Sequence, residues 1–379
     1  MSSPAQTALI LTGGGARAAY QVGVLKAIGR WQGRHKGIPF QILCGTSAGA
    51  INATALGIWS HCLCRGVKQL ERVWGQFETG QVFHADAWHL GMHLLRRVGR
   101  FFQADYARQL QPCLLNPQPL QQLLAERLPF HLLDRQIKLG RLKALAVTAS
   151  SYTERSSVTF FTGDSQCQPW QRARRSGVRI HFNETHLMAS TALPFLFPPV
   201  RIRNQFFCDG TIHQLNPLSP AIHLGASRIL VIGTQYQQLH TLKPAHVHPP
   251  TAGTIAGHLM ESVFTDALNA DLERTWRVNQ TLELIPERKR RQLPLRTLDT
   301  LVIQPSRDLD AIAAQHYSSL PAAIRWLLAR LGVADEEDAS LLSYLLFEAP
   351  YCQELIALGE QDAERQKAAI ASHLGIMAH

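Results

Sequence analysis

The sequence predicts an α/β protein, with a mostly parallel sheet between two layers of helices and a helical C-terminal extension. Two strand–turn–helix units follow one another in the first sixty residues, and strand-like apolar runs return later in the chain. Successive units of this kind place their strands side by side and their helices on both faces of the sheet. With 379 residues, 46% hydrophobic and 17% charged, the chain can bury a sizeable core, which excludes a disordered protein.

The elements follow from the apolar runs and the glycine turns between them. We expect strands at residues 8–11, 40–44, 142–148, 157–161, 205–208, 228–232 and 300–304. Helical patterns cover residues 16–28, 50–59, most of 61–139, and the chain from 308 onward. These patterns divide the chain into a core domain (1–235), a loop with the remaining core elements (236–305) and a helical C-terminal extension (306–379).

The composition limits the cellular compartment in which the protein is expected and the kinds of partner it can bind. The chain has 38 basic and 28 acidic residues, and a net charge of +10 suggests an anionic partner such as a phospholipid surface or nucleic acid. Seven cysteines without regular spacing do not form a disulfide framework, so a reducing compartment fits best. The N-terminus lacks a basic segment before its short apolar run, and no apolar stretch reaches spanning length. We therefore expect a cytoplasmic protein that can touch a membrane from outside.

The second turn, Gly45-Thr46-Ser47-Ala48-Gly49, has the G-x-S-x-G pattern of a nucleophile elbow. This chemistry needs a serine on a sharp strand-to-helix turn, where its hydroxyl is lifted clear of the sheet. Small residues on either side let the turn close, and the helix behind favours negative charge near the serine. The pentapeptide alone is weak evidence, since an ordinary glycine-rich turn has the same composition. Its position between a strand and a helix strengthens the prediction for Ser47.

The first turn contains Gly13-Gly14-Gly15, followed by Arg17. A dinucleotide site would need an acidic residue at the end of the next strand, and none occurs between Val22 and Leu70. A phosphate loop would need a Gly-Lys-Ser/Thr ending, which is also missing. Consecutive glycines can instead expose backbone N–H groups where a tetrahedral intermediate develops charge. We prefer this oxyanion-hole interpretation once Ser47 is accepted as a nucleophile.

A candidate base for Ser47 is Asp209, in Phe206-Phe207-Cys208-Asp209-Gly210. An apolar strand delivers this carboxylate directly into a glycine turn, and sites in open parallel sheets form at such strand ends. The alternative is an ordinary Asp-Gly turn. The 17 histidines make any single histidine an uninformative choice.

Taken together, these motifs resemble the patatin-like phospholipases. The match consists of Gly-Gly-Gly-x-Arg, the elbow about thirty residues later, the segments 188–194 and 197–200, and Asp-Gly followed by Asn216-Pro217. The resemblance covers roughly residues 7–235, and residues 266–279 and 342–359 are similar to the C-terminal extension of bacterial members. It implies the three-layer FabD/lysophospholipase-like fold, and it makes residues 1–235 the catalytic domain.

The resemblance also implies roles for the motif residues. Ser47 would be the nucleophile and Asp209 the general base of a dyad without histidine, and Gly13, Gly14, Gly15 and Arg17 would form the oxyanion-hole segment. Two positions depart from the family pattern: Ala18 stands for a glycine, and Asp-Gly-Thr stands for Asp-Gly-Gly or Asp-Gly-Ala. Both changes exchange small residues and leave the dyad intact.

The expected function is a lipid acyl hydrolase, phospholipase A or lysophospholipase, with no cofactor and no metal. The expected partners are a phospholipid or other acyl-ester substrate and an anionic membrane surface, but not nucleic acid, and the helical C-terminus offers a surface for a homodimer. A neutral-lipid esterase, a thioesterase or an acyltransferase could use the same residues. The alternative of another class is a non-catalytic lipid-binding regulator.

Three weaker signals lie outside these motifs. His246 and His248 have no neighbouring carboxylate, so a metal site there is disfavoured. The basic run 288–291 could touch anionic head groups, although a solvated loop is the simpler interpretation. Residues 85–105 mix arginines with Trp88, Met92, Phe101 and Phe102, which favours a mobile cover over Ser47 or, equally well, ordinary helix packing.

Overall fold

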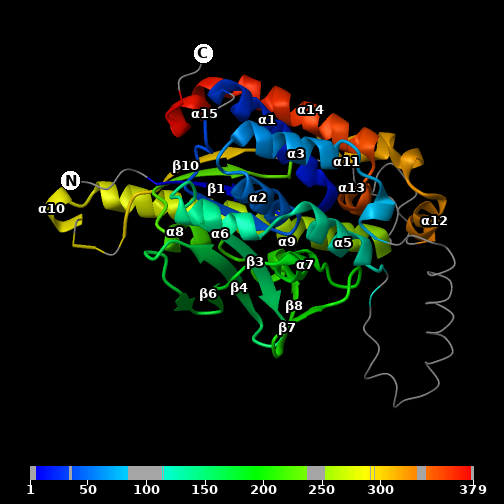
Figure 1. Cartoon of the computed structure of the whole chain (residues 1–379), viewed down its shortest axis with the longest axis horizontal. Helices are drawn as coiled ribbons and strands as arrows, with labels where there is room; N and C mark the ends of the chain where they lie inside the picture. Colours follow the sequence, from blue (N-terminus) through cyan, green and yellow to red (C-terminus); the bar gives the residue numbers. More distant parts are fainter. Residues whose placement is uncertain are drawn as a thin grey trace.

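A computed structural model of the chain describes residues 6–33, 36–83, 113, 115–236, 252–290, 292–293, 295–330 and 339–376. In these residues a ten-stranded sheet runs through the molecule, with the main order β10-β9-β1-β2-β3-β4-β6-β5 (Figure 1). The strands are β1 (Thr7–Leu11), β2 (Ile42–Thr46), β3 (Ala144–Ser151), β4 (Ser156–Gly163), β5 (Trp170–Arg172), β6 (Arg175–Arg179), β7 (Val200–Ile202), β8 (Gln205–Asp209), β9 (Arg228–Ile232) and β10 (Asp299–Ile303).

Strands β10, β9, β1, β2 and β3 are parallel to one another. Strand β4 turns back antiparallel to β3, and β8 also pairs antiparallel with β3, beyond the end of β2. The predicted mostly parallel sheet with helices is confirmed, and the antiparallel pairs make the sheet a mixed one.

Helices cover both faces of the sheet. They are α1 (Ala19–Gln32), α2 (Ala48–Ile58), α3 (Leu63–Trp74), α5 (Gln118–Arg127), α6 (His131–Lys138), α7 (Glu184–Thr191), α8 (Ser219–His223), α9 (Ala252–Glu283), α10 (Glu287–Arg290), α11 (Leu309–Gln315), α12 (Ala322–Arg330), α13 (Ser340–Leu345), α14 (Ala349–Arg365) and α15 (Lys367–Leu374), with short 3-10 turns that include η1 (Gly15–Ala18) and η4 (Gly210–His213).

The alternation of β1 side chains separates the two hydrophobic layers. Leu9 and Leu11 pack into the larger core, which also contains residues of α1, α2, α3 and α14. Ala8 and Ile10 point into the smaller core under α8 and α9. Successive strand residues face opposite sides of a sheet, so a strand buried on both faces is apolar throughout.

The C-terminal helices pack into the larger core rather than beside it. Helix α14 runs along α1 at the top of the molecule in Figure 1. A Cβ atom added to Gly23 of α1 would lie 2.0 Å from the Ile356 carbonyl oxygen, and one added to Gly359 of α14 would lie 2.1 Å from the Tyr20 oxygen. The two backbones therefore approach too closely for any side chain but hydrogen. The Tyr20 hydroxyl donates to Asp362 at 3.1 Å across the same contact.

The strand boundaries differ in detail from the sequence predictions. The second strand covers Ile42–Thr46 rather than 40–44, because its pairing with β1 begins at Ala8 and Ile42. Strands β5, β6 and β7 were not predicted, since they are short and β5 and β6 carry arginines in place of an apolar run. None of the helices in the described ranges combines the length and apolar composition needed to cross a membrane.

Candidate active site

Ser47 lies on a strained turn between β2 and α2. Its backbone has φ 55° and ψ −131°, and its side chain is almost fully buried. A Cβ atom at Gly45 would meet Ala50 Cα at 2.5 Å, and one at Gly49 would meet the Leu11 carbonyl oxygen at 2.3 Å. The elbow therefore requires glycine on both sides of the serine. Strained backbone of this kind persists where the surrounding structure holds it, and it is common at nucleophiles.

Hydrogen bonds that involve Ser190 and Thr148 hold the Ser47 turn in place. The Ser47 backbone N–H donates to Ser190 Oγ at 2.9 Å, and the Ser190 hydroxyl donates to the Thr148 carbonyl oxygen at 2.7 Å. Because its own N–H is occupied, Ser47 contributes only its side chain to the site. The sequence reasoning missed this support, although Ser190 lies in the matched segment 188–194.

Asp209 is fully buried at the end of β8. Its Oδ1 accepts hydrogen bonds from the Thr211 N–H at 3.0 Å and the Thr211 hydroxyl at 2.7 Å. Its Oδ2 is buried and forms no hydrogen bond with any described residue. Burial raises the pKa of the Asp209 carboxyl to about 6, while Ser47 and Thr211 act in the opposite direction.

The Ser47 side chain is therefore close enough to influence Asp209, but no bond of ordinary geometry joins it to Oδ2. Such bonds are often long in unliganded sites and tighten when substrate binds.

From the sequence, Asp209 is expected at the end of a strand, beside the ends of other strands in a parallel sheet. The structure differs from this expectation in the direction of the strand. Strand β8 is antiparallel to β3 and pairs Asp209 with Ala149, whereas β2 is parallel to β3 and pairs Thr46 with Thr148. The two candidate residues thus arrive at the same place from opposite directions along one edge of β3, because β4 pairs with the other edge. Gly210 is required at this point, because a Cβ atom there would lie 2.1 Å from the Thr148 carbonyl oxygen.

One residue of the glycine segment, Gly15, borders the space next to Ser47. Gly15 and Ser47 line the same cavity, and the N–H groups of Gly14 and Gly15 have no hydrogen-bond partner among the described residues. Gly13 accepts a bond from the Thr234 hydroxyl at 2.6 Å, which holds the loop against β9. Unpaired backbone N–H groups beside a nucleophile are the donors that an oxyanion hole needs.

Arg17 turns away from this loop. Its guanidinium donates to Ser343 at 2.7 Å, to Gln235 at 2.7 Å and to Asp310, and it stacks on the Tyr344 ring at 4.0 Å. These partners tie the glycine segment to the C-terminal helices. In this structure Arg17 is therefore placed to position the loop, while the glycines carry the free N–H groups.

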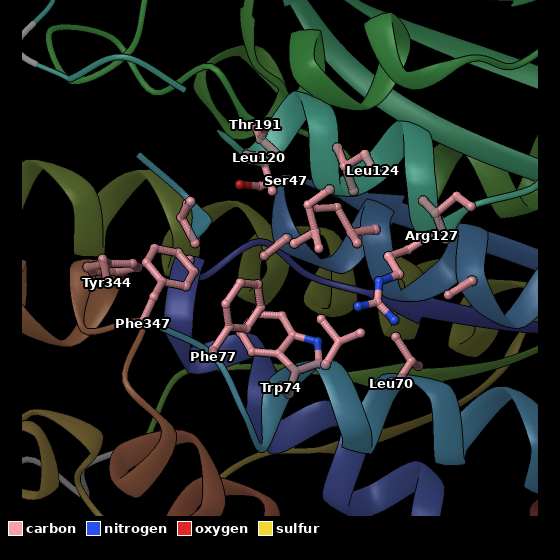
Figure 2. A pocket seen from close by; sticks show the side chains of 18 of the residues that line it. Ser47, Leu70, Trp74, Phe77, Leu120, Leu124, Arg127, Thr191, Tyr344 and Phe347 are labelled. Atoms are coloured by element: carbon pink, nitrogen blue, oxygen red, sulfur yellow. The ribbon is translucent and has the colours of Figure 1, made fainter. Parts of the chain in front are cut away.

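A large apolar cavity opens onto Ser47. It encloses about 1010 Å³, including its mouth, and it is lined mostly by α2, α3 and α5 together with residues from segment 344–347. Figure 2 shows Leu70, Trp74, Phe77, Leu120 and Leu124 around the space next to Ser47, with Arg127 at the end away from Tyr344 and Phe347. The apolar lining suits an acyl chain.

Histidine and metal chemistry find little support in the described residues. No histidine is among the described residues that line the cavity containing Ser47. No group of three or more His, Cys, Asp or Glu side chains within the described part of the chain could hold a metal ion. The pair His246 and His248 lies outside the described residues.

The structure describes little of the other two segments with weak signals, residues 85–105 and 288–291. Residues 85–105, the expected cover, lie outside the described residues. In the basic run, Arg288 and Lys289 are exposed on α10, Arg290 donates to the Ile285 carbonyl oxygen at 3.1 Å, and Arg291 is not described.

Comparison with known proteins agrees with the fold and the motif order. A family model described as patatin-like phospholipase matches residues 9–222. The chain belongs to this family, and membership implies a serine ester hydrolase that acts on lipid acyl groups. A search of curated proteins finds no match.

Among solved structures, the chain is similar to VipD from Legionella pneumophila. The identity is 13%, the TM-score is 0.35, and the match covers 94% of this chain and 67% of VipD. It is also similar to ExoU, in its complex with SpcU from the type III secretion system of Pseudomonas aeruginosa. That match has 16% identity and a TM-score of 0.28, and it covers 98% of this chain and 78% of the other.

Proposed function

We propose that the protein is a phospholipase A or lysophospholipase in which Ser47 is the nucleophile and Asp209 the general base. The observation that carries this proposal is that the buried Ser47 hydroxyl, near a carboxylate with one unpaired oxygen, opens onto an apolar cavity of about 1010 Å³. A cavity of this kind accepts a fatty-acyl chain and presents its ester to the serine. The N–H groups of the neighbouring glycines can donate hydrogen bonds to the carbonyl oxygen of this ester.

The reaction divides between these groups. Asp209 Oδ2 takes the proton from Ser47 Oγ as the oxygen bonds to the ester carbonyl carbon, and the carbonyl oxygen becomes negative against the N–H groups of Gly14 and Gly15. The ester C–O bond then breaks, and the departing alcohol takes the proton from Asp209. A water molecule then gives a proton to Asp209 as its oxygen attacks the carbonyl carbon of acyl-Ser47, and Asp209 returns this proton to Ser47 Oγ as the C–Oγ bond breaks and the fatty acid leaves.

A carboxylate is a weaker base than imidazole, and burial partly compensates for this. The raised pKa of Asp209, about 6, makes its carboxylate a better proton acceptor while leaving it mostly ionised near neutral pH. The tight bonding of Oδ1 to Thr211 leaves Oδ2 as the atom that can accept the proton.

Labelling with a fluorophosphonate probe tests the nucleophile. We expect the wild type and Ser60→Ala to label and Ser47→Ala not to label; Ser60 is a buried serine that is not among the described residues lining the cavity. Labelling of Ser47→Ala would contradict the assignment.

Mass spectrometry of products from phosphatidylcholine tests the reaction. Free fatty acid together with lysophospholipid would support the proposal. New acyl esters of an added alcohol would indicate an acyltransferase, and the absence of any product would indicate a lipid-binding protein.

A further inference from the structure

A second cavity lies on the opposite side of the sheet from the acyl cavity. It has a volume of about 730 Å³, including the open space at its mouth, between β4, the β5–β6 hairpin, the η4 segment, α8 and α9, and none of the described residues lines both cavities. Its side chains include Arg174, Arg175, Arg274, His213, Asn216 and Ser219, and none of the described residues that line it is acidic. A cavity with three arginines and no acidic wall concentrates positive potential.

The positive charge of this cavity is poorly neutralised. Arg175 donates one N–H to the neutral amide oxygen of Asn216, and its buried Nε has no hydrogen-bond partner among the described residues. Arg274 lies 3.7 Å from Asp271, near the limit for an ion pair. Asp271 is already held by the Leu218 N–H at 3.0 Å, and burial raises the pKa of its carboxyl.

No acidic side chain pairs with Arg174 in the described part of the chain. Burial lowers the pKa of His213, and the nearby charge of Arg174 lowers it further. Burial also lowers the pKa of the neighbouring His223, and the charges of Arg172, Arg175 and Arg296 lower it further. The acidic group closest to these arginines is Asp271, which interacts with Arg274 and Arg175.

We propose that this cavity binds a phosphate group, either inorganic phosphate or a phosphomonoester. Planar guanidinium groups bind phosphate oxygens through paired N–H donors, and three guanidinium groups, those of Arg174, Arg175 and Arg274, line this cavity. Hydroxyl and amide groups from Ser219, Ser157 and Asn216 supply further neutral donors around the arginines. The size of the cavity leaves room for an ester substituent.

The cavity is connected to the candidate dyad through η4. Gln214 lines it, accepts a bond from the Thr46 hydroxyl at 2.7 Å and donates to the Thr148 hydroxyl at 3.3 Å. The N–H of His213 donates to Ser150 at 3.0 Å. Thr46 precedes Ser47 and η4 follows Asp209, so a ligand in this cavity touches the segment that carries the dyad without entering the acyl cavity.

The test measures binding rather than catalysis, so its outcome is independent of the proposed hydrolase. The full-length protein is titrated calorimetrically with inorganic phosphate at constant ionic strength, as wild type and as the double variant Arg174→Gln/Arg274→Gln. The matched control is Arg203→Gln/Arg277→Gln. Arg203 has φ 54° in the β7–β8 turn, as Arg174 has φ 55° in the β5–β6 turn, and Arg277 lies one turn from Arg274 on α9.

Both double variants remove the same charge from exposed positions, and unchanged thermal unfolding checks that they fold. We expect phosphate affinity to fall by about tenfold or more in Arg174→Gln/Arg274→Gln and to stay within about twofold of the wild type in the control. Equal phosphate affinity in the two variants, or no phosphate binding by the wild type, would overturn the proposal.

A second arm identifies the source of the phosphate. Binding to phosphatidylcholine vesicles with and without phosphatidic acid is compared for the same proteins. If the double variant loses its preference for phosphatidic acid together with phosphate binding, the ligand is a lipid head group. If it loses only phosphate binding, the ligand is a soluble phosphate compound. Either result supports the site.

Discussion

Thr211 donates two hydrogen bonds to the same carboxylate oxygen of Asp209, one from its backbone at 3.0 Å and one from its hydroxyl at 2.7 Å. The other oxygen of Asp209 is left buried and without a hydrogen-bond partner among the described residues. The threonine that departs from the family pattern therefore orients the carboxylate. Burial raises the pKa of the Asp209 carboxyl, and the hydrogen bond from the Thr211 hydroxyl lowers it.

This contact predicts the pH profile. Hydrolysis needs ionised Asp209, so kcat/KM should fall below about pH 6, the pKa of its carboxyl. Thr211→Val removes one donor to the charged form, so the pKa should rise and the acid limb should move to higher pH by about half to one unit. Thr211→Ser keeps the hydroxyl and serves as the control. An unshifted limb in Thr211→Val would show that this bond does not tune the base.

Ionisation of Asp209 should also cost stability. Its pKa is higher in the folded protein, about 6, than the ordinary value of 3.8, so the folded state binds more protons between these values and stability falls as pH rises through them. The difference between the two pKa values corresponds to a destabilisation of roughly 3 kcal/mol. This destabilisation is absent below about pH 4 and fully present above about pH 6.

The substitution Asp209→Asn removes this penalty. We expect it to raise the free energy of unfolding at pH 8 by as much as about 3 kcal/mol and to leave it nearly unchanged at pH 3.5, as measured by urea denaturation. Asp134→Asn, at a partly exposed aspartate remote from the site, should show no such pH-dependent gain. A destabilised Asp209→Asn protein at pH 8 would contradict the argument.

Gly15 should tolerate no side chain. Its φ is +54°, and a Cβ atom would lie 2.3 Å from the Tyr344 carbonyl oxygen. We expect Gly15→Ala to destabilise the protein by more than about 2 kcal/mol and to displace the Gly13-Gly14-Gly15 segment. Gly140→Ala is the matched control, since its φ is +67° with no atom within 4 Å. It should lose about 1 kcal/mol from backbone strain alone. Equal thermal unfolding shifts in the two variants would show that the Tyr344 contact is unimportant.

The acyl cavity predicts a preference for chain length. Leu124 is buried in its wall between Leu120, near Ser47, and Arg127 at the far end (Figure 2). Leu124→Trp should fill this part of the cavity and lower kcat/KM for a long-chain ester by about tenfold or more, while a two-carbon acyl ester is hydrolysed normally. Gln122→Trp, at an exposed position on the same helix, is the control. Equal losses on both esters would place the acyl chain elsewhere.

The local parts of the site could be predicted from sequence because they depend on neighbouring residues. The elbow around Ser47 is one turn between a strand and a helix, and its glycines are required by backbone contacts. The antiparallel arrival of Asp209 could not be predicted, since β8 is short and its pairing with β3 depends on a long connection. The partners of Arg17, at Asp310 and Ser343, lie about three hundred residues away along the chain.

The cavity was equally inaccessible to sequence reasoning. Trp74 and Phe347 stack with ring centroids 6.3 Å apart, although one belongs to α3 and the other to the C-terminal region. No local periodicity links such residues. The hydroxyl groups in β3, Thr148, Ser150 and Ser151, were a usable signal, because three polar side chains at the end of a buried strand need partners.

The most direct test of the central claim is kcat/KM for fatty-acid release from phosphatidylcholine, measured for the wild type, Ser47→Ala, Asp209→Asn and the double variant. Groups that act in one step are strongly non-additive, so each single variant should lose about a thousandfold or more, and the double variant should lose little beyond either. Retention of most wild-type activity in Asp209→Asn, or of any substantial activity in Ser47→Ala, would contradict the dyad.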